Sequence, residues 1–376
     1  MEKEKKKIKI MHVAECAGGV DRYLRSLVKY IDHNKFENVM VLSQLYRQED
    51  YMELADKVEI INMSHGIGIK ALLSAKKVRN LIKQYEPDVV YGHSSIAGAI
   101  TRLANIGLKS KCIYNPHGWC FNMQNRKKNL YILLEKMMAP FCEKIICISD
   151  AEKESALEKK ICGNDKLKVI YNGIDLNETS SGNIKREDLK IPNEAFVVGM
   201  VGRICKQKAT DIFVKMAGVI AKEKKNAYFI IVGNVLEGAE EERKKIEILA
   251  EKEKIRLQIT GWVNDPIEYV KLFDVACLLS RWEGFGLAIP EYMLCRKPIV
   301  ATNIDAIPNL IENRKNGILV DVDDYNAAAN SVLELADDEE LRSRLITNGI
   351  NTVNKRFDVR RVSKELEKLV IELIET

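Results

Sequence analysis

The sequence lacks the features that mark membrane-spanning and secreted proteins. No apolar run approaches the roughly 20 residues that cross a bilayer as a helix. The lysine-rich start, residues 1–14, has no long apolar segment and no cleavage-like site, which argues against a signal peptide. Nine cysteines are scattered without any CxxC pair, a pattern typical of reduced cytosolic thiols. We therefore expect a cytoplasmic protein.

Two kinds of binding site are also missing from the pattern. No histidine or cysteine cluster has the spacing of metal ligands. The net charge of +5 is modest for 376 residues and no aromatic-rich basic motif accompanies it, so nothing favours nucleic acid as a partner. With 46% apolar and 30% charged residues the composition is that of a globular protein, and the length suits two domains of about 150 to 200 residues.

What the sequence does contain is a regular alternation of strand-like and helix-like segments. A first series runs from a strand at residues 7–14 to one at residues 168–170, and a second series begins at residues 195–201. Between them, residues 179–192 are polar, which favours a linker. The alternation predicts an α/β fold of two doubly wound, Rossmann-like parallel sheets facing an interdomain cleft, where ligands bind beside the carboxyl ends of the strands.

The most informative stretch is residues 280–291, SRWEGFGLAIPE, which follows a short apolar run of strand length. It places Glu283 in a loop and Glu291 inside the following helix. A glycine loop that opens a helix presents free N–H groups and the positive end of the helix dipole, which suits a phosphate or a sugar. Carboxylates facing such a loop accept hydrogen bonds from vicinal hydroxyls. The loop between them consists of Gly284, Phe285, Gly286 and Leu287.

Two other loops have residues suited to phosphate. Gly18 and Gly19 stand between the first strand and a helix, although paired glycines also make plain tight turns. Gly202 follows the first strand of the second series, and Arg203 and Lys208 come next. A guanidinium fork and an ammonium are the pair that a diphosphate leaving group requires. The alternative is a set of solvated surface cations, and the position at a strand end favours the site.

Single residues after other strands are further candidates. His117 follows a strand and precedes a glycine, a place from which a histidine can donate to a sugar hydroxyl; the alternative is a packed loop histidine. For His93, also at a strand end, the structural interpretation has at least equal weight. Trp262 and Val263 follow a strand of the second series, where they either line a base pocket or pack in the core.

The stretch from residue 126 to residue 138 is basic and amphipathic. Three cations, Arg126, Lys127 and Lys128, precede an apolar stripe that includes Leu130 and Met137. Such a helix can rest on anionic lipid headgroups. The alternative is a core helix that buries the same stripe against the sheet.

Together these motifs resemble glycosyltransferase family 4, also called glycosyl transferases group 1, over nearly the whole chain. Glu283 and Glu291 match the family's E-x7-E signature, including the internal Gly-Phe-Gly-Leu. Gly202, Arg203 and Lys208 match its phosphate-binding stretch, while residues 18–19 and 171–175 match its first glycine loop and its interdomain NGID segment. The resemblance implies the GT-B architecture. It also implies domain boundaries at residues 1–172 for an acceptor-side domain, 173–357 for a nucleotide-sugar-binding domain and 358–376 for a helix that returns to the first domain.

The resemblance further implies roles for these residues. Glu283 would hold donor-sugar hydroxyls, Glu291 the nucleotide ribose, and the backbone of residues 284–287 would approach the sugar and diphosphate. Arg203 and Lys208 would neutralise the departing diphosphate, and His117 would lie near the reacting face of the sugar. The acceptor would attack from the side that the leaving group departs, so the reaction retains configuration and requires no protein nucleophile, metal or other cofactor. The remaining predicted donor contacts are Gly18, Gly19, Gly202 and Val263.

Three features depart from or complicate this pattern. Ala209 stands where a glycine usually follows the lysine, and Asp305-Ala306 replaces a frequent Gly-Gly, which leaves the donor sugar open. Residues 321–324, DVDD, look like the DxD motif of metal-dependent sugar transferases. Because they precede a helix that begins near Tyr325, we expect an aspartate N-cap there.

The expected function is transfer of a hexose from a nucleotide sugar, with a UDP-sugar expected as the donor, to a saccharide or polyprenyl-linked acceptor in cell-surface polysaccharide synthesis. The site of action would be the cytoplasm, with peripheral contact at the inner membrane face. One alternative is a catalytically inactive GT-B partner subunit, which should have lost Glu283, Arg203 or Lys208, yet all three are present. The other is a nucleotide-sugar epimerase, which gives no reason for the E-x7-E pattern.

Overall fold

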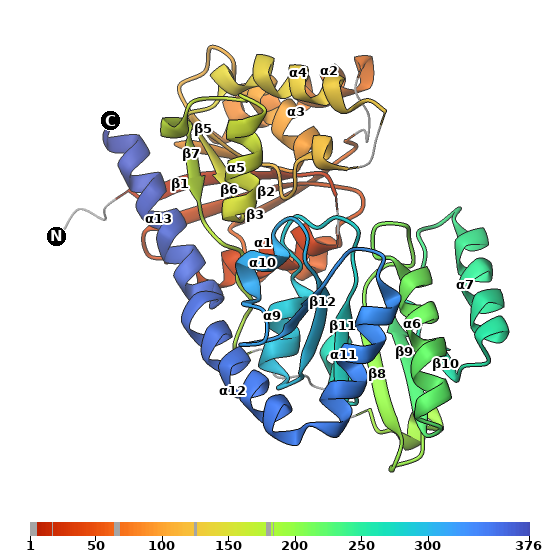
Figure 1. The fold of residues 1–376 in the computed structure, drawn as a ribbon. Coiled ribbons are helices and arrows are strands. Elements are labelled where there is room, and N and C mark those ends of the chain that lie inside the picture. The colour runs from red at the N-terminus through yellow and green to blue at the C-terminus, as the bar shows by residue number, and fades with distance from the viewer. Residues whose placement is uncertain (1–5, 17, 64–67, 124–125, 178–181, 183) are drawn as a thin grey trace. The chain divides into compact units, whose positions relative to one another are not determined.

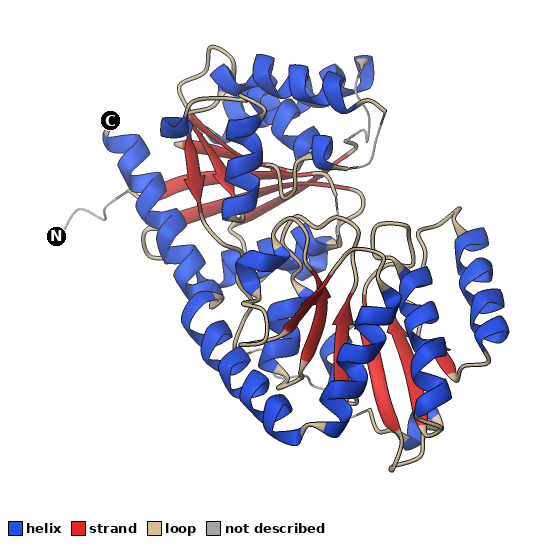
Figure 2. Ribbon diagram, viewed as in Figure 1, coloured by secondary structure: helices blue, strands red, loops and turns tan. Residues whose placement is uncertain are grey.

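The computed structural model describes residues 6–16, 18–63, 68–123, 126–177, 182 and 184–376. Residues 179–181 and 183 of the predicted linker, and residues 1–5 of the lysine-rich start, lie outside that set. The chain divides into two compact units, Met1–Asp175 with Phe357–Thr376 and Leu176–Arg356. Each unit is a parallel β-sheet covered by helices (Figures 1 and 2). The predicted fold class, two Rossmann-like parallel-sheet domains, is confirmed.

The first unit is built on a seven-stranded sheet in the order β3-β2-β1-β4-β5-β6-β7. All its strands are parallel, which is why they read in the sequence as continuous apolar runs buried on both faces. The strands are β1 (Ile8–Ala14), β2 (Phe36–Ser43), β3 (Lys57–Ile61), β4 (Val89–His93), β5 (Lys111–Asn115), β6 (Lys144–Cys147) and β7 (Leu167–Val169).

Helices cover both faces of this sheet (Figure 2). One face packs against α1 and α13, and Leu24 of the first helix lies in the same apolar cluster as Leu366 of the last. The other face packs against α2 and α3, through residues such as Val78 and Ile100. The helices are α1 (Gly19–Tyr30), α2 (Ile69–Tyr85), α3 (Ser95–Asn105), α4 (Lys128–Met138), α5 (Asp150–Glu158) and α13 (Val359–Glu375).

The second unit has a six-stranded parallel sheet in the order β10-β9-β8-β11-β12-β13. Its apolar core joins the sheet to α6, α7, α11 and α12. The strands are β8 (Phe196–Val201), β9 (Ala227–Val232), β10 (Leu257–Ile259), β11 (Val275–Leu278), β12 (Ile299–Thr302) and β13 (Ile318–Val320). The helices are α6 (Thr210–Glu223), α7 (Glu240–Glu253), α8 (Pro266–Val270), α9 (Ala288–Leu294), α10 (Ile307–Leu310), α11 (Tyr325–Asp337) and α12 (Glu339–Arg356).

The strand order determines where the loops that contain the predicted site residues lie. In each sheet the chain moves outward from a central strand in one direction and then in the other, so the order reverses between β1 and β4 in the first unit and between β8 and β11 in the second. Loops that follow such neighbouring strands diverge and leave room for a ligand. Both Lys208 and Glu283 lie in loops of this kind, after β8 and β11. Among the described residues, no helix combines the length and the apolar character that crossing a membrane requires.

Candidate functional site

The loops after β8 and β11 meet in an ion pair. The ammonium of Lys208 donates to Oε2 of Glu283, and both side chains are largely buried, at 16% and 9% exposed. The hydroxyl of Ser280 donates to the same carboxylate oxygen over 3.2 Å. Two sequence-predicted residues, 75 positions apart, are thus brought together at the switch point of the second sheet.

Glycine is required beside this pair. A side chain at Gly202 would place its Cβ 3.3 Å from Cγ of Lys208, tighter than ordinary contact, so a larger residue would displace the lysine. Gly286 has a φ of +86°, which other residues rarely adopt, and it turns the chain from the Glu283 loop into α9. Both glycines belong to the predicted donor-binding set, and their conformations explain why the motif needs glycine at these places.

Arg281 holds the two loops together, a function that sequence reasoning missed. Its guanidinium donates twice to Asp211, from Nη1 to Oδ1 over 3.0 Å and from Nη2 to Oδ2 over 2.7 Å. Nε donates to Oδ1 of Asp323 over 2.6 Å, and Nη1 also reaches the carbonyl oxygen of Lys206 at 3.1 Å. The hydrogen bond between Arg281 and Asp211 raises the pKa of Arg281. Burial alone would raise the pKa of Asp211, but the hydrogen bond and the charge of Arg281 outweigh it and lower that pKa.

Arg203 lies at the edge of this arrangement. It is exposed and its Nη2 reaches Oε1 of Gln207 at 3.5 Å. Gln207 in turn donates to the carbonyl oxygen of Trp282 over 3.2 Å, and the N–H of Arg281 donates to the carbonyl of Gln207 over 2.8 Å. Arg203 therefore connects to the Glu283 loop through Gln207, whereas Lys208 contacts Glu283 itself.

Asp305 is a second carboxylate at the same loop. Its Oδ2 accepts the backbone N–H of Glu283 over 2.9 Å. Burial raises the pKa of Asp305, the hydrogen bond from Glu283 opposes that effect, and the nearby Glu283 charge adds to it. Asp305 has a φ of +45°, a left-handed conformation that glycine adopts at lower cost. The structure thus gives the sequence departure at this position a defined contact.

The other predicted residues of the second unit have varied environments. Glu291 lies in the first turn of α9 and is 3% exposed, and Phe285 is equally buried. Trp262 is 60% exposed, so it is not a core residue. Gly284, Leu287 and Val263 are partly buried in the loops around the ends of β11 and β10.

The first unit carries the remaining predicted residues. Gly18 is exposed, with a φ of +88°, and precedes α1, whose first residue is Gly19. His117 follows β5, is partly exposed, and has a φ of +52°. It belongs to a row of histidines that the sequence did not predict: Nδ1 of His93 lies 3.1 Å from Nε2 of His117, and Nε2 of His93 lies 3.2 Å from Nδ1 of His12.

Burial controls the charge of this histidine row. It lowers the pKa of His12 to about 4 and that of His117 to about 3, and it holds the pKa of His93 well below its usual range. The neighbouring histidines lower the pKa of His93 further. All three imidazoles are therefore neutral at physiological pH. Next to them, burial raises the pKa of Glu152 to about 7, although this carboxylate accepts the backbone N–H groups of Gly118 and Ile148, each over 2.6 Å.

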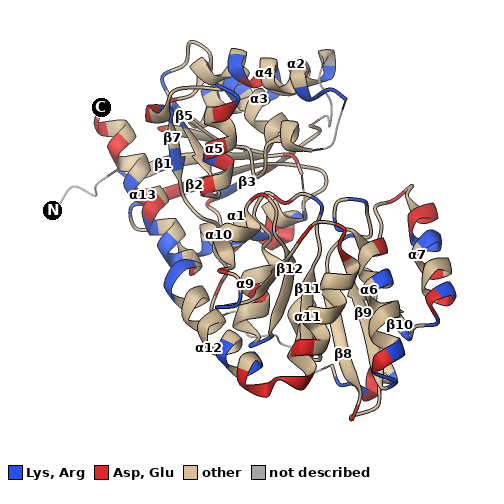
Figure 3. Ribbon diagram, in the orientation of Figure 1, with Lys and Arg blue, Asp and Glu red and all other residues tan. Residues whose placement is uncertain are grey.

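Helix α4 presents an exposed apolar stripe. Leu130, Leu133 and Met137, spaced by three and four positions, are 46%, 54% and 60% exposed, and Phe141 continues the line at 43%. We call these four residues the α4 stripe. The alternative of a stripe buried against the sheet is therefore wrong for these side chains. Exposed cations accompany the stripe, namely Arg126, Lys127, Lys128 and Lys136. Figure 3 colours the Lys and Arg positions of the ribbon blue.

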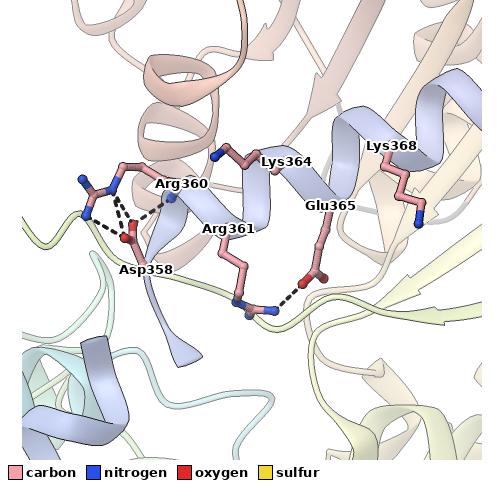
Figure 4. Close-up of a pocket in the computed structure, with 6 residues that line it drawn as sticks. All are labelled: Asp358, Arg360, Arg361, Lys364, Glu365 and Lys368. Atoms are coloured by element: carbon pink, nitrogen blue, oxygen red, sulfur yellow. Dashed lines mark hydrogen bonds and ion pairs between the residues drawn. The ribbon is translucent and has the colours of Figure 1, made fainter. Parts of the chain in front are cut away.

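A shallow hollow on the first unit lies along the start of α13 (Figure 4). Its cations are partly neutralised within the hollow, since Arg360 pairs with Asp358 and Arg361 with Glu365. The residues predicted from the motifs line the strand ends and not this hollow. Its lining consists of Asp358, Arg360, Arg361, Lys364, Glu365 and Lys368.

The acidic run before α11 has a structural use. Asp324 caps the helix, because its carboxylate accepts the N–H of Ala327 over 2.8 Å, as expected from the sequence. Asp323 pairs with Arg281. In the part of the chain that the structure describes, no group of three or more histidine, cysteine, aspartate and glutamate side chains is arranged to hold a metal ion.

Comparison with known proteins finds family matches in both halves of the chain. Residues 17–178 match Glycosyltransferase Family 4, and residues 182–352 match Glycosyl transferases group 1. The chain is 29% identical to the UDP-Gal:alpha-D-GlcNAc-diphosphoundecaprenol alpha-1,3-galactosyltransferase of Escherichia coli, covering 94% of this chain and 95% of the relative. It is 30% identical to an uncharacterized 41.2 kDa protein in the cps region of Klebsiella pneumoniae, covering 87% and 89%.

Solved structures share the fold. Anabaena HepE in complex with UDP-glucose superposes with a TM-score of 0.83 at 22% identity, over 97% of this chain and all of that one. A glycosyltransferase from Rickettsia africae gives a TM-score of 0.83 at 20% identity, over 99% of this chain and all of that one. At these identities the likeness establishes the architecture.

Proposed function

Because this chain belongs to glycosyltransferase family 4, we propose that it transfers a hexose from a UDP-sugar, with retention of configuration, to a lipid-linked saccharide during cell-surface polysaccharide synthesis. The observation that carries the proposal is the Lys208–Glu283 pair at the switch point of the second sheet. Relatives support the finer choices. The Escherichia coli relative is named for a UDP-galactose donor and a diphosphoundecaprenol-linked acceptor, and a Staphylococcus aureus relative for capsular polysaccharide biosynthesis.

The charges of Lys208 and Glu283 suggest a different role for each residue in the reaction. When the sugar–phosphate bond breaks, negative charge develops on the diphosphate, and Lys208 with Arg203 supplies cations to stabilise it. Glu283 has acceptor oxygens for hydroxyls of the departing sugar. The acceptor hydroxyl forms the new bond on the face from which the diphosphate leaves, and a diphosphate oxygen takes its proton. Removing Lys208 should cost about 2 to 4 kcal/mol of transition-state stabilisation.

We further propose that this chemistry is independent of metal ions. Cationic side chains of the Lys208 loop supply the charge that a divalent ion supplies in other transferases, and the DVDD aspartates Asp323 and Asp324 are engaged with Arg281 and with the N-terminus of α11. Treatment with EDTA should leave the transfer rate unchanged. A strict requirement for manganese after chelation would overturn this part of the proposal.

The decisive experiment removes one carboxylate. A panel of nucleotide sugars is first screened by thermal shift, because a bound donor stabilises the fold by mass action. With the best donor, Glu283→Ala should abolish transfer while binding of the free nucleotide survives; wild-type rates would remove Glu283 from the site. A matched control is Glu312→Ala, an exposed carboxylate that pairs with Lys315. Hydrolysis of the donor without acceptor supports a transferase, whereas an epimerised donor supports the epimerase alternative.

We also propose that the α4 stripe rests on the inner face of the plasma membrane, where a lipid-linked acceptor is found. The exposed apolar residues sit beside Arg126, Lys127, Lys128 and Lys136, and Glu135 on the same helix is buried against Arg102. Each basic residue near an anionic bilayer contributes about 1 kcal/mol, so these cations together contribute about 4 kcal/mol at low salt. The apolar side chains add the burial of their exposed surface.

Vesicle sedimentation tests this surface. Wild-type protein should pellet with vesicles containing phosphatidylglycerol, less so with phosphatidylcholine alone, and should be released by salt. Lys127→Glu combined with Lys128→Glu should abolish pelleting. Leu133→Gln combined with Met137→Gln should weaken it even at low salt. The matched control, Lys244→Glu with Lys252→Glu on the exposed face of α7, changes net charge equally and should pellet normally. Equal loss in the control would refute a membrane role of α4.

A further inference from the structure

The histidine row of the first unit continues to a fixed end inside the sheet. His12 lies on β1 and is fully buried, and its Nε2 is 3.3 Å from Oδ1 of Asn38 on β2. His93, at the end of β4, is also fully buried. The row therefore runs Asn38, His12, His93, His117, through contacts of 3.3, 3.2 and 3.1 Å, from the sheet interior to a partly exposed imidazole. No residue of this row except His117 has a role in the proposed transfer.

Neutral imidazoles in a row can order their protons in only two ways, since each ring has one donor and one acceptor nitrogen. Oδ1 of Asn38 is an acceptor, so Nε2 of His12 carries the proton and Nδ1 is bare. Nδ1 of His12 then accepts from Nε2–H of His93, whose bare Nδ1 accepts from Nε2–H of His117. The last ring is left with a bare Nδ1, which has no partner among the described residues.

We propose that Asn38, His12 and His93 are positioning residues that hold His117 as the Nε2–H tautomer, so that its Nδ1 accepts a hydrogen bond from a hydroxyl of a saccharide substrate. The inference rests on the proposed function for the identity of that hydroxyl, but the tautomer is a property of the protein alone. Under this proposal the His117 side chain accepts a hydrogen bond from the ligand, whereas the sequence led us to expect a donor there.

The surroundings fix the ring as well as its proton. The N–H of His117 donates to Oδ1 of Asn115 over 3.0 Å, which holds the left-handed backbone, and Nδ2 of Asn115 donates to the hydroxyl of Tyr91 over 3.2 Å. The ring of Tyr23 packs edge-on against His117, with 4.8 Å between ring centres. Asn115 fixes the backbone of His117, Tyr23 packs against its ring and His93 contacts its Nε2. Only Nδ1 is then left to bind a ligand.

One rearrangement would reverse the order of protons. Nδ2 of Asn38 is buried without a partner, and turning the amide over would make Asn38 the donor to His12. Every proton in the row would then shift, and His117 would carry its proton on Nδ1. Nitrogen-15 NMR of histidine-labelled wild-type protein distinguishes the two orders directly. A protonated Nε2 and a bare Nδ1 on His117 support the proposal, and the opposite assignment overturns it. His33, which contacts the carbonyl of Val28, serves as an internal reference outside the row.

Asn38→Asp tests the relay from its far end. The introduced carboxylate favours a doubly protonated His12, which donates from both nitrogens and so reverses the row. We expect His117 to appear as the Nδ1–H tautomer, and transfer to fall about 10-fold or more because the hydroxyl meets a donor in place of an acceptor. Asn105→Asp, another buried asparagine of this unit, is the matched control and should leave the His117 tautomer unchanged. The protonation state of His12 is read from the same spectra: a doubly protonated His12 with an unchanged His117 tautomer overturns the proposal, whereas a neutral His12 that donates to the carboxylate keeps the original order and supports it.

His12→Leu covers the case in which Asn38→Asp does not fold. Without its fixed end the row has no preferred order, and His117 should show a mixture of both tautomers; a single Nε2–H form would refute the relay. These experiments test the proposed transferase function and the proposed tautomer of His117 separately. If wild-type protein transfers no sugar from any donor, the proposed function fails while the NMR assignment still tests the row. If transfer is robust and the tautomer is wrong, only the relay fails.

Discussion

Replacing Arg281 with methionine should loosen the loop that carries Glu283 without touching Glu283 itself. Arg281 ties three segments that lie 75, 70 and 42 positions away in the chain: the Lys206 loop, the start of α6 at Asp211 and the turn at Asp323. Its side chain is only 12% exposed. Methionine preserves the apolar stem and removes the fork, so the effect reports on the ionic contacts.

The magnitude follows from exposure. The paired hydrogen bonds to Asp211, whose side chain is 38% exposed, count as charged hydrogen bonds worth about 1.5 to 3 kcal/mol together in a partly buried setting. The contact with Asp323, which is 51% exposed, adds about 0 to 1 kcal/mol. Arg281→Met should therefore lower the free energy of unfolding by about 1.5 to 4 kcal/mol. The transfer rate should fall as well, because Glu283 and Lys208 lose their fixed separation.

Denaturant unfolding of wild type and variant at several pH values measures this. The pKa of Asp211 lies below its ordinary value of 3.8 in the folded protein, so its stabilisation is present above that value and is lost as pH falls through the lowered pKa. The difference between wild type and Arg281→Met should accordingly shrink in strong acid. Arg243→Met, which removes a helix pair with Glu247 and a 3.2 Å hydrogen bond to Oδ1 of Asn234, is the control and should cost less than about 1 kcal/mol. Equal losses in the two variants would refute the reasoning.

Two further predictions concern single carboxylates. Asp305→Gly should leave the melting temperature unchanged or raise it, because glycine suits a φ of +45°. The same variant should change the ratio of the kcat/KM values for two UDP-hexoses, because it removes the carboxylate that contacts Glu283. An unchanged ratio would contradict this. Glu152→Gln should flatten the pH dependence of stability. Burial raises the pKa of Glu152 from 4.5 to about 7. The contribution of this group to the free energy of unfolding is therefore fully present below pH 4.5 and is lost as the pH rises through about 7, a loss of at most about 3 kcal/mol. An equal loss of stability between pH 5 and 8 in wild type and variant would contradict this prediction.

The strands were predictable because burial dictates their composition. A parallel strand covered on both faces must be apolar throughout, so β9 and β11 appear in the sequence as runs within one residue of their observed ends. The Asp324 cap was predictable for a similar reason, since it satisfies a helix N–H through a local contact three residues away. Local rules suffice wherever the partner is close in the chain.

The site was only partly predictable because its contacts are distant in the chain. Glu283 and Lys208 carry a recognisable motif, but nothing local links Arg281 to Asp211, 70 positions away. His12 stands in an apolar strand, and only the register that pairs β1 with β4 brings it to His93. Periodicity showed that α4 has an apolar stripe and left open which way it faces. That choice depends on the packing of neighbouring helices, which the stripe itself does not encode.

The run DVDD shows how spatial neighbours give a short motif its meaning. Asp323 and Asp324 are adjacent in the chain, yet their carboxylates serve different partners. Asp324 accepts an N–H at the start of α11, and Asp323 turns to a guanidinium that also holds the start of α6. The two carboxylates of a motif that resembles a metal site thus cap a helix and hold the arginine that supports the Glu283 loop. Under the metal-independent proposal the charge for the diphosphate comes from side chains, so that proposal depends on the lysine at position 208 and the arginine at position 203.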